Sequence, residues 1–299
     1  MLRRITNLGL TFALMALILS SPVAVLAQSG STQQPKTPAK TTTPEQKPAP
    51  APKQTPTKID PNNLTAEQIV ETAIVLYGTR PGLAQVRRNG FEHGKVTSVK
   101  EDGRTEDSTY ERRFIRGENF EKDKVRLDQK TPTLEYSLVY GEGKTWGFIN
   151  GSAFTPRAEA TNDFLSQMWH GIDALLRYKE NGSTITLVGK DKQQNIDLYV
   201  IDLTNKNKRQ TRYYISQKYY RVLKLEYEEA QADGGKPLKY MRKFYDYQYI
   251  QNTLVPKRTV FYEDGKQKQE TYVMSVTYGI KIDDTLFQNP ESQTTSANP

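Results

Sequence analysis

Apolar residues recur at helical spacing in a short segment that begins at Thr65. Thr65 and Gln68 have the form of a capping box, which satisfies free backbone N–H groups at the start of a helix. The apolar residues that follow share one face of this helix: Ile69, Val70, Ala73, Ile74 and Tyr77. Gly78 and Pro81 predict where the helix ends.

A second helix is predicted from about Asn162 to the Asn181–Gly182 pair. Its apolar residues recur at i, i+4 and i+8 and form a wide face: Phe164, Leu165, Met168, Trp169, Ile172, Leu175 and Leu176. The polar residues on the other face are expected to point away from the core: Ser166, Gln167, His170, Asp173 and Arg177. The wide apolar face requires a broad apolar partner.

Most of the remaining sequence alternates between apolar and polar residues and is rich in the β-branched and aromatic residues that strands prefer. Turn signals separate these segments at 101–103, 141–143, 150–151, 205–207, 233–235 and 263–265. Three sets of alternating residues predict apolar strand faces: Tyr199, Ile201 and Leu203; Leu223, Leu225 and Tyr227; and Tyr272, Met274, Val276, Tyr278 and Ile280. One apolar face and one polar face are typical of an antiparallel sheet that is covered on a single side.

Two helices are too few to cover the apolar face of a flat sheet of about ten to twelve strands. The predicted fold is therefore α+β: a strongly curved antiparallel sheet, or incomplete β-barrel, covered by two or more helices. A curved sheet of this kind leaves an apolar cavity on its concave side, where an acyl chain or another apolar ligand can bind.

The first 62 residues differ in composition from the rest of the chain. Arg3 and Arg4 precede an apolar run, and small residues stand before a cleavage site after Ala27, so residues 1–27 are predicted to be a signal peptide. Residues 28–62 are rich in Pro and Lys and predict a disordered linker. The folded domain is expected at 63–290, with a short disordered tail at 291–299. This organisation predicts that the protein is exported.

Composition excludes several classes of function. The chain has no Cys and two His, which excludes thiol chemistry and His-rich metal sites. The formal net charge is +8, but half of the excess left after the signal peptide lies in the linker, so the charge does not indicate a nucleic-acid partner. His93 is interpreted as a surface-turn residue, and Asp283–Asp284 as a solvated turn. We expect no catalytic residue, metal site or cofactor.

The predicted cavity draws its candidate ligand residues from the second helix and from several strands. They are Trp146, Phe148, Phe164, Met168, Trp169, Leu176, Ile201, Leu223, Leu225 and Tyr227. The alternative interpretation of the aromatic members of this set is ordinary core packing, since aromatic stripes mostly pack.

The order of several segments resembles a known superfamily. They are 199–203, 212–216, 222–227, 244–247, 254–258 and 276–287, followed by Pro290. This run is similar to the LolA-like outer-membrane lipoprotein-sorting proteins, a superfamily that includes LolB and the RseB-type regulators. The resemblance implies an unclosed half-barrel with helices over its mouth, which binds acylated lipoproteins or other hydrophobic ligands. It also implies a gating arginine, for which Arg87, Arg88, Arg112, Arg113 and Arg116 are all candidates.

Two functions follow from this interpretation. The first is a non-catalytic periplasmic carrier of a lipid, an acyl chain or an acylated lipoprotein. The second is an envelope sensor or scaffold that recognises an inner- or outer-membrane protein through the same fold.

Overall fold

Thirteen antiparallel strands form one sheet in the computed structural model, which describes residues 63–231 and 234–289. The segments predicted to be a signal peptide at 1–27, a disordered linker at 28–62 and a disordered tail at 291–299 lie outside the described residues. The strands are β1 Asn89–Val99, β2 Thr105–Ile115, β3 Lys124–Lys130, β4 Glu135–Gly141, β5 Lys144–Ile149, β6 Ser152–Phe154, β7 Thr184–Gln193, β8 Ile196–Thr204, β9 Gln210–Ser216, β10 Val222–Glu229, β11 Leu238–Ile250, β12 Thr253–Glu263 and β13 Lys266–Tyr278. The helices are α1 Ala66–Tyr77, α2 Arg80–Val86, α3 Ala158–Trp169 and α4 Ile172–Leu176, with 3-10 turns η1 Phe120–Lys122 and η2 Asp284–Phe287.

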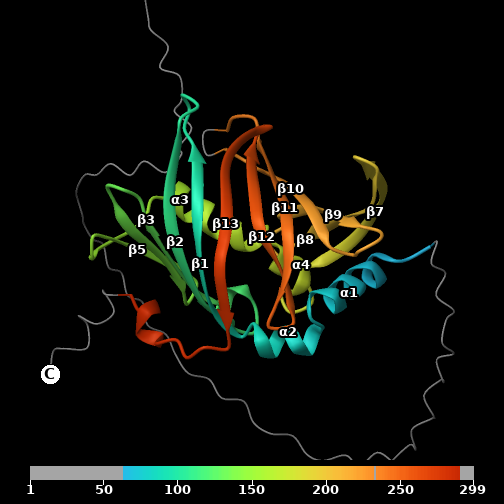
Figure 1. Cartoon of the computed structure of the whole chain (residues 1–299), viewed down its shortest axis with the longest axis horizontal. Helices are drawn as coiled ribbons and strands as arrows, with labels where there is room; N and C mark the ends of the chain where they lie inside the picture. Colours follow the sequence, from blue (N-terminus) through green and yellow to red (C-terminus); the bar gives the residue numbers. More distant parts are fainter. Residues whose placement is uncertain (1–62, 232–233, 290–299) are drawn as a thin grey trace, which may run out of the picture. The chain divides into compact units, whose positions relative to one another are not determined.

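The order of the strands makes the two edge strands neighbours in the sequence. It runs β6-β5-β4-β3-β2-β1-β13-β12-β11-β10-β9-β8-β7, so the two edge strands are joined only by the segment 155–183. This segment contains α3 and α4, which cross behind the central strands (Figure 1). The curvature of the sheet gives these helices a concave side to cover.

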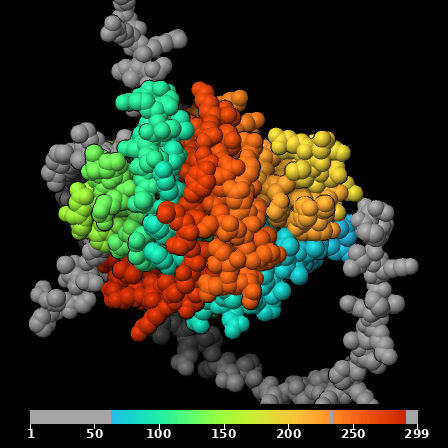
Figure 2. Space-filling view, viewed as in Figure 1, coloured from blue at the N-terminus to red at the C-terminus, as the bar shows by residue number. Residues whose placement is uncertain are grey.

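The outer face of the sheet is formed by strands. In Figure 2, β1 and β2 lie beside β13, and β12 and β11 follow. The helices pack on the opposite, concave side. The predicted α+β half-barrel is confirmed. The described residues form thirteen strands instead of the ten to twelve expected, and their four α-helices agree with the expected two or more.

Helix α1 forms as its sequence predicts. Thr65 accepts a hydrogen bond from the Gln68 backbone, and the Gln68 side chain accepts one from the Thr65 backbone. Its five predicted apolar residues are buried. At its end, the Tyr77 hydroxyl lies 3.0 Å from the Tyr247 hydroxyl and accepts a hydrogen bond from the Val222 backbone, which fixes α1 against β10 and β11.

The predicted second helix is wrong in one respect, because the structure divides it into α3 and α4 at His170–Gly171. The carbonyl of Gly171 accepts a hydrogen bond from the buried hydroxyl of Tyr213, and the carbonyl of His170 accepts one from Arg242. These side chains from β9 and β11 hold the break in place. Several residues of the predicted polar face are buried on both sides of the break: Ser166, His170 and Arg177.

Two β-bulges place some residues on the opposite face of their strand from the predicted one. The register between β9 and β10 shifts between Val222 and Lys224, so Leu223 packs with Leu198 and Val200 on the outer face while Leu225 and Tyr227 face the helices. A second shift between β1 and β13 leaves Met274 as the extra residue. Tyr272 and Met274 are therefore exposed, whereas Val276 and Tyr278 are buried as predicted.

Side chains fill most of the concave side. One core cluster joins α1 and α4 to β8–β11, and a second joins α3 to β2–β4, β12 and β13. Among the described residues, no helix has the length and apolar character needed to cross a membrane. The concave side is thus largely packed, and a cavity lies between the two clusters.

Candidate functional site

The cavity lies between the concave face of the sheet and the α3–α4 segment, and its volume is about 220 Å³. Its apolar wall includes Phe114, Val125, Met168, Ile172, Val255 and Tyr278. Its polar wall includes Arg87, Glu92, Arg112, Arg116, Asp123, Asp173 and Arg177. The sequence predicts an apolar cavity, whereas the observed cavity has one apolar wall and one charged wall.

Strand alternation in β2 places two arginines in the cavity. Tyr110 and Phe114 are buried on the concave face, and Arg112 lies between them on the same side. Arg116 follows two residues later and also lines the cavity. Arg113 has the opposite orientation and pairs with Glu111 and Asp128.

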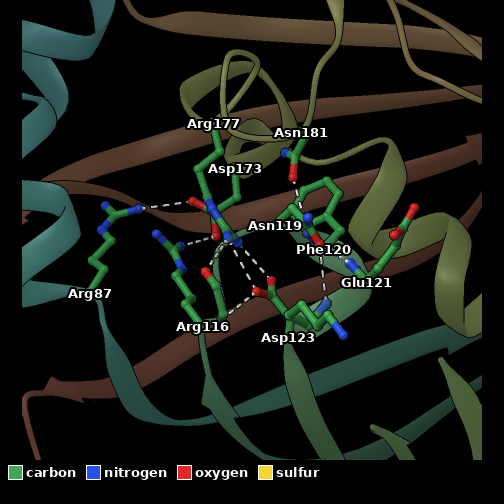
Figure 3. A network of polar contacts seen from close by, with 11 residues as sticks. Arg87, Arg116, Asn119, Phe120, Glu121, Asp123, Asp173, Arg177 and Asn181 are labelled. Carbon is green, nitrogen blue, oxygen red and sulfur yellow. Dashed lines mark hydrogen bonds and ion pairs between the residues drawn. The ribbon is translucent and has the colours of Figure 1, made fainter. Parts of the chain in front are cut away.

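Asp173 on α4 is the centre of the first ion-pair group (Figure 3). Its Oδ1 lies 3.3 Å from Nη1 of Arg87, and its Oδ2 accepts a hydrogen bond from Nη2 of Arg116. Burial alone would raise the pKa of Asp173, but Arg116 and Arg87 outweigh burial and hold that pKa well below its ordinary value. Asp173 is therefore a carboxylate shared between two guanidinium groups.

Arg177 and Asp123 form a second, self-contained pair. Arg177 donates to both carboxylate oxygens of Asp123, at 2.6 and 3.1 Å, and to the carbonyl of Gly117. Asn181 accepts a hydrogen bond from the backbone N–H of Phe120 (Figure 3). These contacts attach the 117–123 loop to the residues that follow α4. Because the two charges are opposite, the pair has no net charge.

The remaining charges on the polar wall do not balance. Glu92 accepts a hydrogen bond from the Tyr110 hydroxyl at 2.7 Å. Within the described residues, Arg112 has no carboxylate within ion-pair distance, and its guanidinium lies 5.3 Å from the centre of the Phe114 ring. Arg116 lies 5.5 Å from the centre of the same ring. Burial lowers the pKa of Arg116 despite Asp173.

Nine of the ten predicted cavity residues are divided among four clusters, and Trp169 lies apart from them. Leu176, Ile201, Leu225 and Tyr227 belong to the cluster beneath α1 and α4. Phe164 and Met168 belong to the cluster beneath α3, and Met168 alone of the ten lines the cavity.

The other four lie apart from these clusters. Trp146 and Phe148 pack with Phe287 near η2. Leu223 is on the outer face, and the Arg209 guanidinium lies 3.9 Å from the centre of the Trp169 ring. A ligand role for these residues stays a prediction.

The two histidines also differ from their predicted positions. His170 is buried, with Nδ1 lying 2.6 Å from the Thr211 hydroxyl and its ring stacked on Tyr227 at 3.9 Å. Burial lowers the pKa of His170 despite the nearby carboxylate of Glu229. His93 lies within β1 beside a β-bulge and not in a turn. No group of three potential metal ligands occurs among residues 63–231 and 234–289.

A second hollow lies on the outside of α1. It has a volume of about 480 Å³ and is lined by Thr72, Val75, Leu76, Lys218, Tyr219, Tyr220, Arg221, Tyr249 and Leu254. The side chains of Val75, Tyr219 and Tyr249 are more than half exposed. This surface, called the α1 groove below, is apolar with two cationic residues at its rim.

Comparison with solved structures identifies the fold. A LolA superfamily protein from Nitrosomonas europaea is 13% identical over 77% of this chain and 100% of its own, with a TM-score of 0.52. The fold is LolA-like. A DUF1329 family protein from Desulfovibrio piger gives a TM-score of 0.54 at 10% identity, over 76% of this chain and 98% of its own.

A domain described as an outer membrane lipoprotein-sorting protein, from Vibrio parahaemolyticus, gives a TM-score of 0.50 at 12% identity. It matches 73% of this chain and 97% of its own. No protein-family profile matches the sequence, and no curated protein matches it. The LolA-like resemblance seen in the sequence is therefore confirmed as a resemblance of fold.

The charged wall of the cavity was not predicted as a site. The alternation of Tyr110, Arg112 and Phe114 could have indicated that Arg112 faces inward with its aromatic neighbours. Asp173 and Arg177 could not have been placed, because the predicted continuous helix turned both toward solvent. In the structure both residues line the cavity and follow the break at Gly171.

Proposed function

We propose that this protein is a non-catalytic carrier or binder of a lipid, an acyl chain or an acylated lipoprotein in the bacterial periplasm. The observation that carries this proposal is the amphipathic cavity of about 220 Å³ beneath α3 and α4, in a LolA-like half-barrel. Burial of acyl methylene groups against Phe114, Met168 and Val255 would contribute about 0.8 kcal/mol each.

In this proposal, the cavity of about 220 Å³ belongs to a closed conformation. Binding pockets usually have volumes of about 300–1,000 Å³, so a long acyl chain requires more room than is open here. In this proposal the α3–α4 segment is the wall that moves, because it covers the cavity and consists of two short helices that can shift about their attached break. Its displacement would enlarge the cavity along the apolar wall.

Two substitutions of the same residue type test this proposal. Met168 lines the cavity, whereas the side chain of Met274 is 62% exposed on the outer face. Met168→Trp fills the cavity, so we expect it to abolish binding of a fluorescent acyl probe that dodecanoate displaces from the wild type. Met274→Trp should leave binding of this probe unchanged. Thermal melting shows whether both variants fold, and equal probe binding by both folded variants would contradict the proposal.

The α1 groove supports the second candidate, recognition of an envelope protein. Exposed aromatic and aliphatic side chains together are typical of interaction surfaces. A photo-reactive residue at Tyr249 should cross-link one defined membrane protein in cells, while the same residue at exposed Tyr272 should not. Identical cross-linking from both positions would exclude a specific partner at the groove.

A further inference from the structure

From the charge of its polar wall, we infer that the cavity selects amphiphiles with an anionic head, a carboxylate or a phosphate, held by Arg112 and Arg116. This inference rests on the proposed function, since it names the ligand class for the same cavity. Neither the resemblance of fold nor the apolar wall requires a charged ligand.

The first argument is the charge count. Four arginines line the cavity, at positions 87, 112, 116 and 177, against three carboxylates at positions 92, 123 and 173. Arg177 and Asp123 neutralise each other through two hydrogen bonds. The three remaining arginines face only Asp173 and Glu92, so the wall has an excess of positive charge.

The second argument is the set of donors left without acceptors. Asp173 is shared by Arg87 and Arg116, and Nη2 of Arg87 also donates to the carbonyl of Leu254 at 2.7 Å. Nε of Arg87 is buried and has no hydrogen-bond partner among the described residues. The half-buried side chain of Arg112 has no hydrogen bond or ion pair there either, and its guanidinium lies over the Phe114 ring. A buried donor without an acceptor is costly, and an anionic ligand would supply acceptors to these arginines.

The third argument is the arrangement of the two walls. Arg112 and Arg116 lie against the same Phe114 ring, at 5.3 and 5.5 Å from its centre. Phe114 belongs to the apolar cluster that continues through Val125, Met168 and Val255. A head bound between the two guanidinium groups would therefore direct its acyl chain along this cluster. Guanidinium groups bind carboxylates and phosphates through paired hydrogen bonds.

The test compares ligands that share one chain and differ in the head. Binding of dodecanoate, dodecyl phosphate and dodecanol is measured by calorimetry at neutral pH, below the micelle-forming concentrations of the two anions and below the solubility limit of dodecanol. A charge-assisted hydrogen bond corresponds to an affinity difference of about tenfold. We expect the affinity of both anions to be at least about tenfold higher than that of dodecanol. The anion with the higher affinity identifies the preferred head group.

Arg113 provides a matched control, because it follows Arg112 in β2 but pairs on the outer face. Arg113→Gln should keep the preference for the anions, and Arg112→Gln should lose it while still binding dodecanol. Equal affinity for dodecanoate and dodecanol, or an unchanged preference in Arg112→Gln, would overturn the inference and leave the proposed function standing. Binding of none of the three ligands would overturn both. Inorganic phosphate binding as tightly as dodecyl phosphate would also overturn the inference, since the chain would then contribute nothing.

Discussion

Replacing Asp173 by asparagine tests whether one carboxylate holds the polar wall together. The Asp173→Asn substitution keeps the shape of the side chain but removes the charge that Arg87 and Arg116 share. Arg87 and Arg116 side chains are only 8% and 11% exposed, so both cations would stay buried without a counter-ion. Breaking a buried pair on one side costs about 3–5 kcal/mol. Because the Asp173 side chain is 29% exposed, solvent reduces this cost, and we expect about 3 kcal/mol.

Urea unfolding at neutral pH, followed by tryptophan fluorescence, measures this loss. With a slope of about 3 kcal/mol per molar urea, the midpoint should fall by about 1 M. Asp163→Asn is the matched control on α3. Desolvation and the nearby carboxylates of Glu229 and Glu263 raise the pKa of Asp163 to about 6, so removal of its charge should leave stability unchanged or raise it slightly.

The change in stability that dodecanoate causes provides a second readout. The Asp173→Asn cavity has a larger excess of positive charge, so saturating dodecanoate should stabilise this variant more than it stabilises the wild type. An Asp173→Asn midpoint within about 0.2 M of the wild-type value would refute the reasoning. In that case Asp173 would not be the counter-ion that stabilises the buried charges of Arg87 and Arg116.

Three further predictions concern the fold. Leu225→Ala should destabilise the protein by about 3 kcal/mol because Leu225 is fully buried, whereas Leu223→Ala, on the other side of the bulge, should cost about 1 kcal/mol or less; equal losses in urea unfolding would contradict the bulge. Thr65→Ala should cost about 1 kcal/mol through loss of the cap, and Thr72→Ala, exposed on the same helix, should be near neutral, so the same thermal shift in both would exclude capping. Burial lowers the pKa of His170 below its ordinary 6.5, so its contribution to stability is complete above that pH and is lost as the pH falls toward the pKa of the folded state. The stability difference between wild type and His170→Gln should therefore shrink as the solution is acidified, and a difference that grows would reverse the assignment.

The sequence predicts those parts of the fold that depend on local pattern. Helix α1 has its capping box, its apolar face and its terminating Gly78 within a few residues of one another, and the structure agrees with each. The curvature follows from counting strands against helices. Leu223, Tyr272 and Met274 were placed on the wrong face because a bulge depends on the partner strand and leaves no periodic signal.

The polar wall shows why the site was harder to predict than the fold. The helical pattern from Phe164 to Leu176 continues across His170–Gly171, and the hydrogen bonds that interrupt it come from Tyr213 and Arg242, about 40 and 70 residues away in the chain. Asp173 therefore changes from an expected solvent-facing residue to the acceptor for two buried arginines. Sequence periodicity contains no information about such long-range contacts.

Methyl NMR of the methionines tests the central claim, a ligand in the cavity beneath α3 and α4. The described chain contains Met168 in the cavity wall, Met241 on β11 and Met274 exposed on the outer face. Titration with dodecanoate should shift the Met168 methyl resonance saturably and leave the Met274 resonance in place. Shifts at Met274 with none at Met168 would show that the acyl chain binds the outside of the sheet, and would contradict the account.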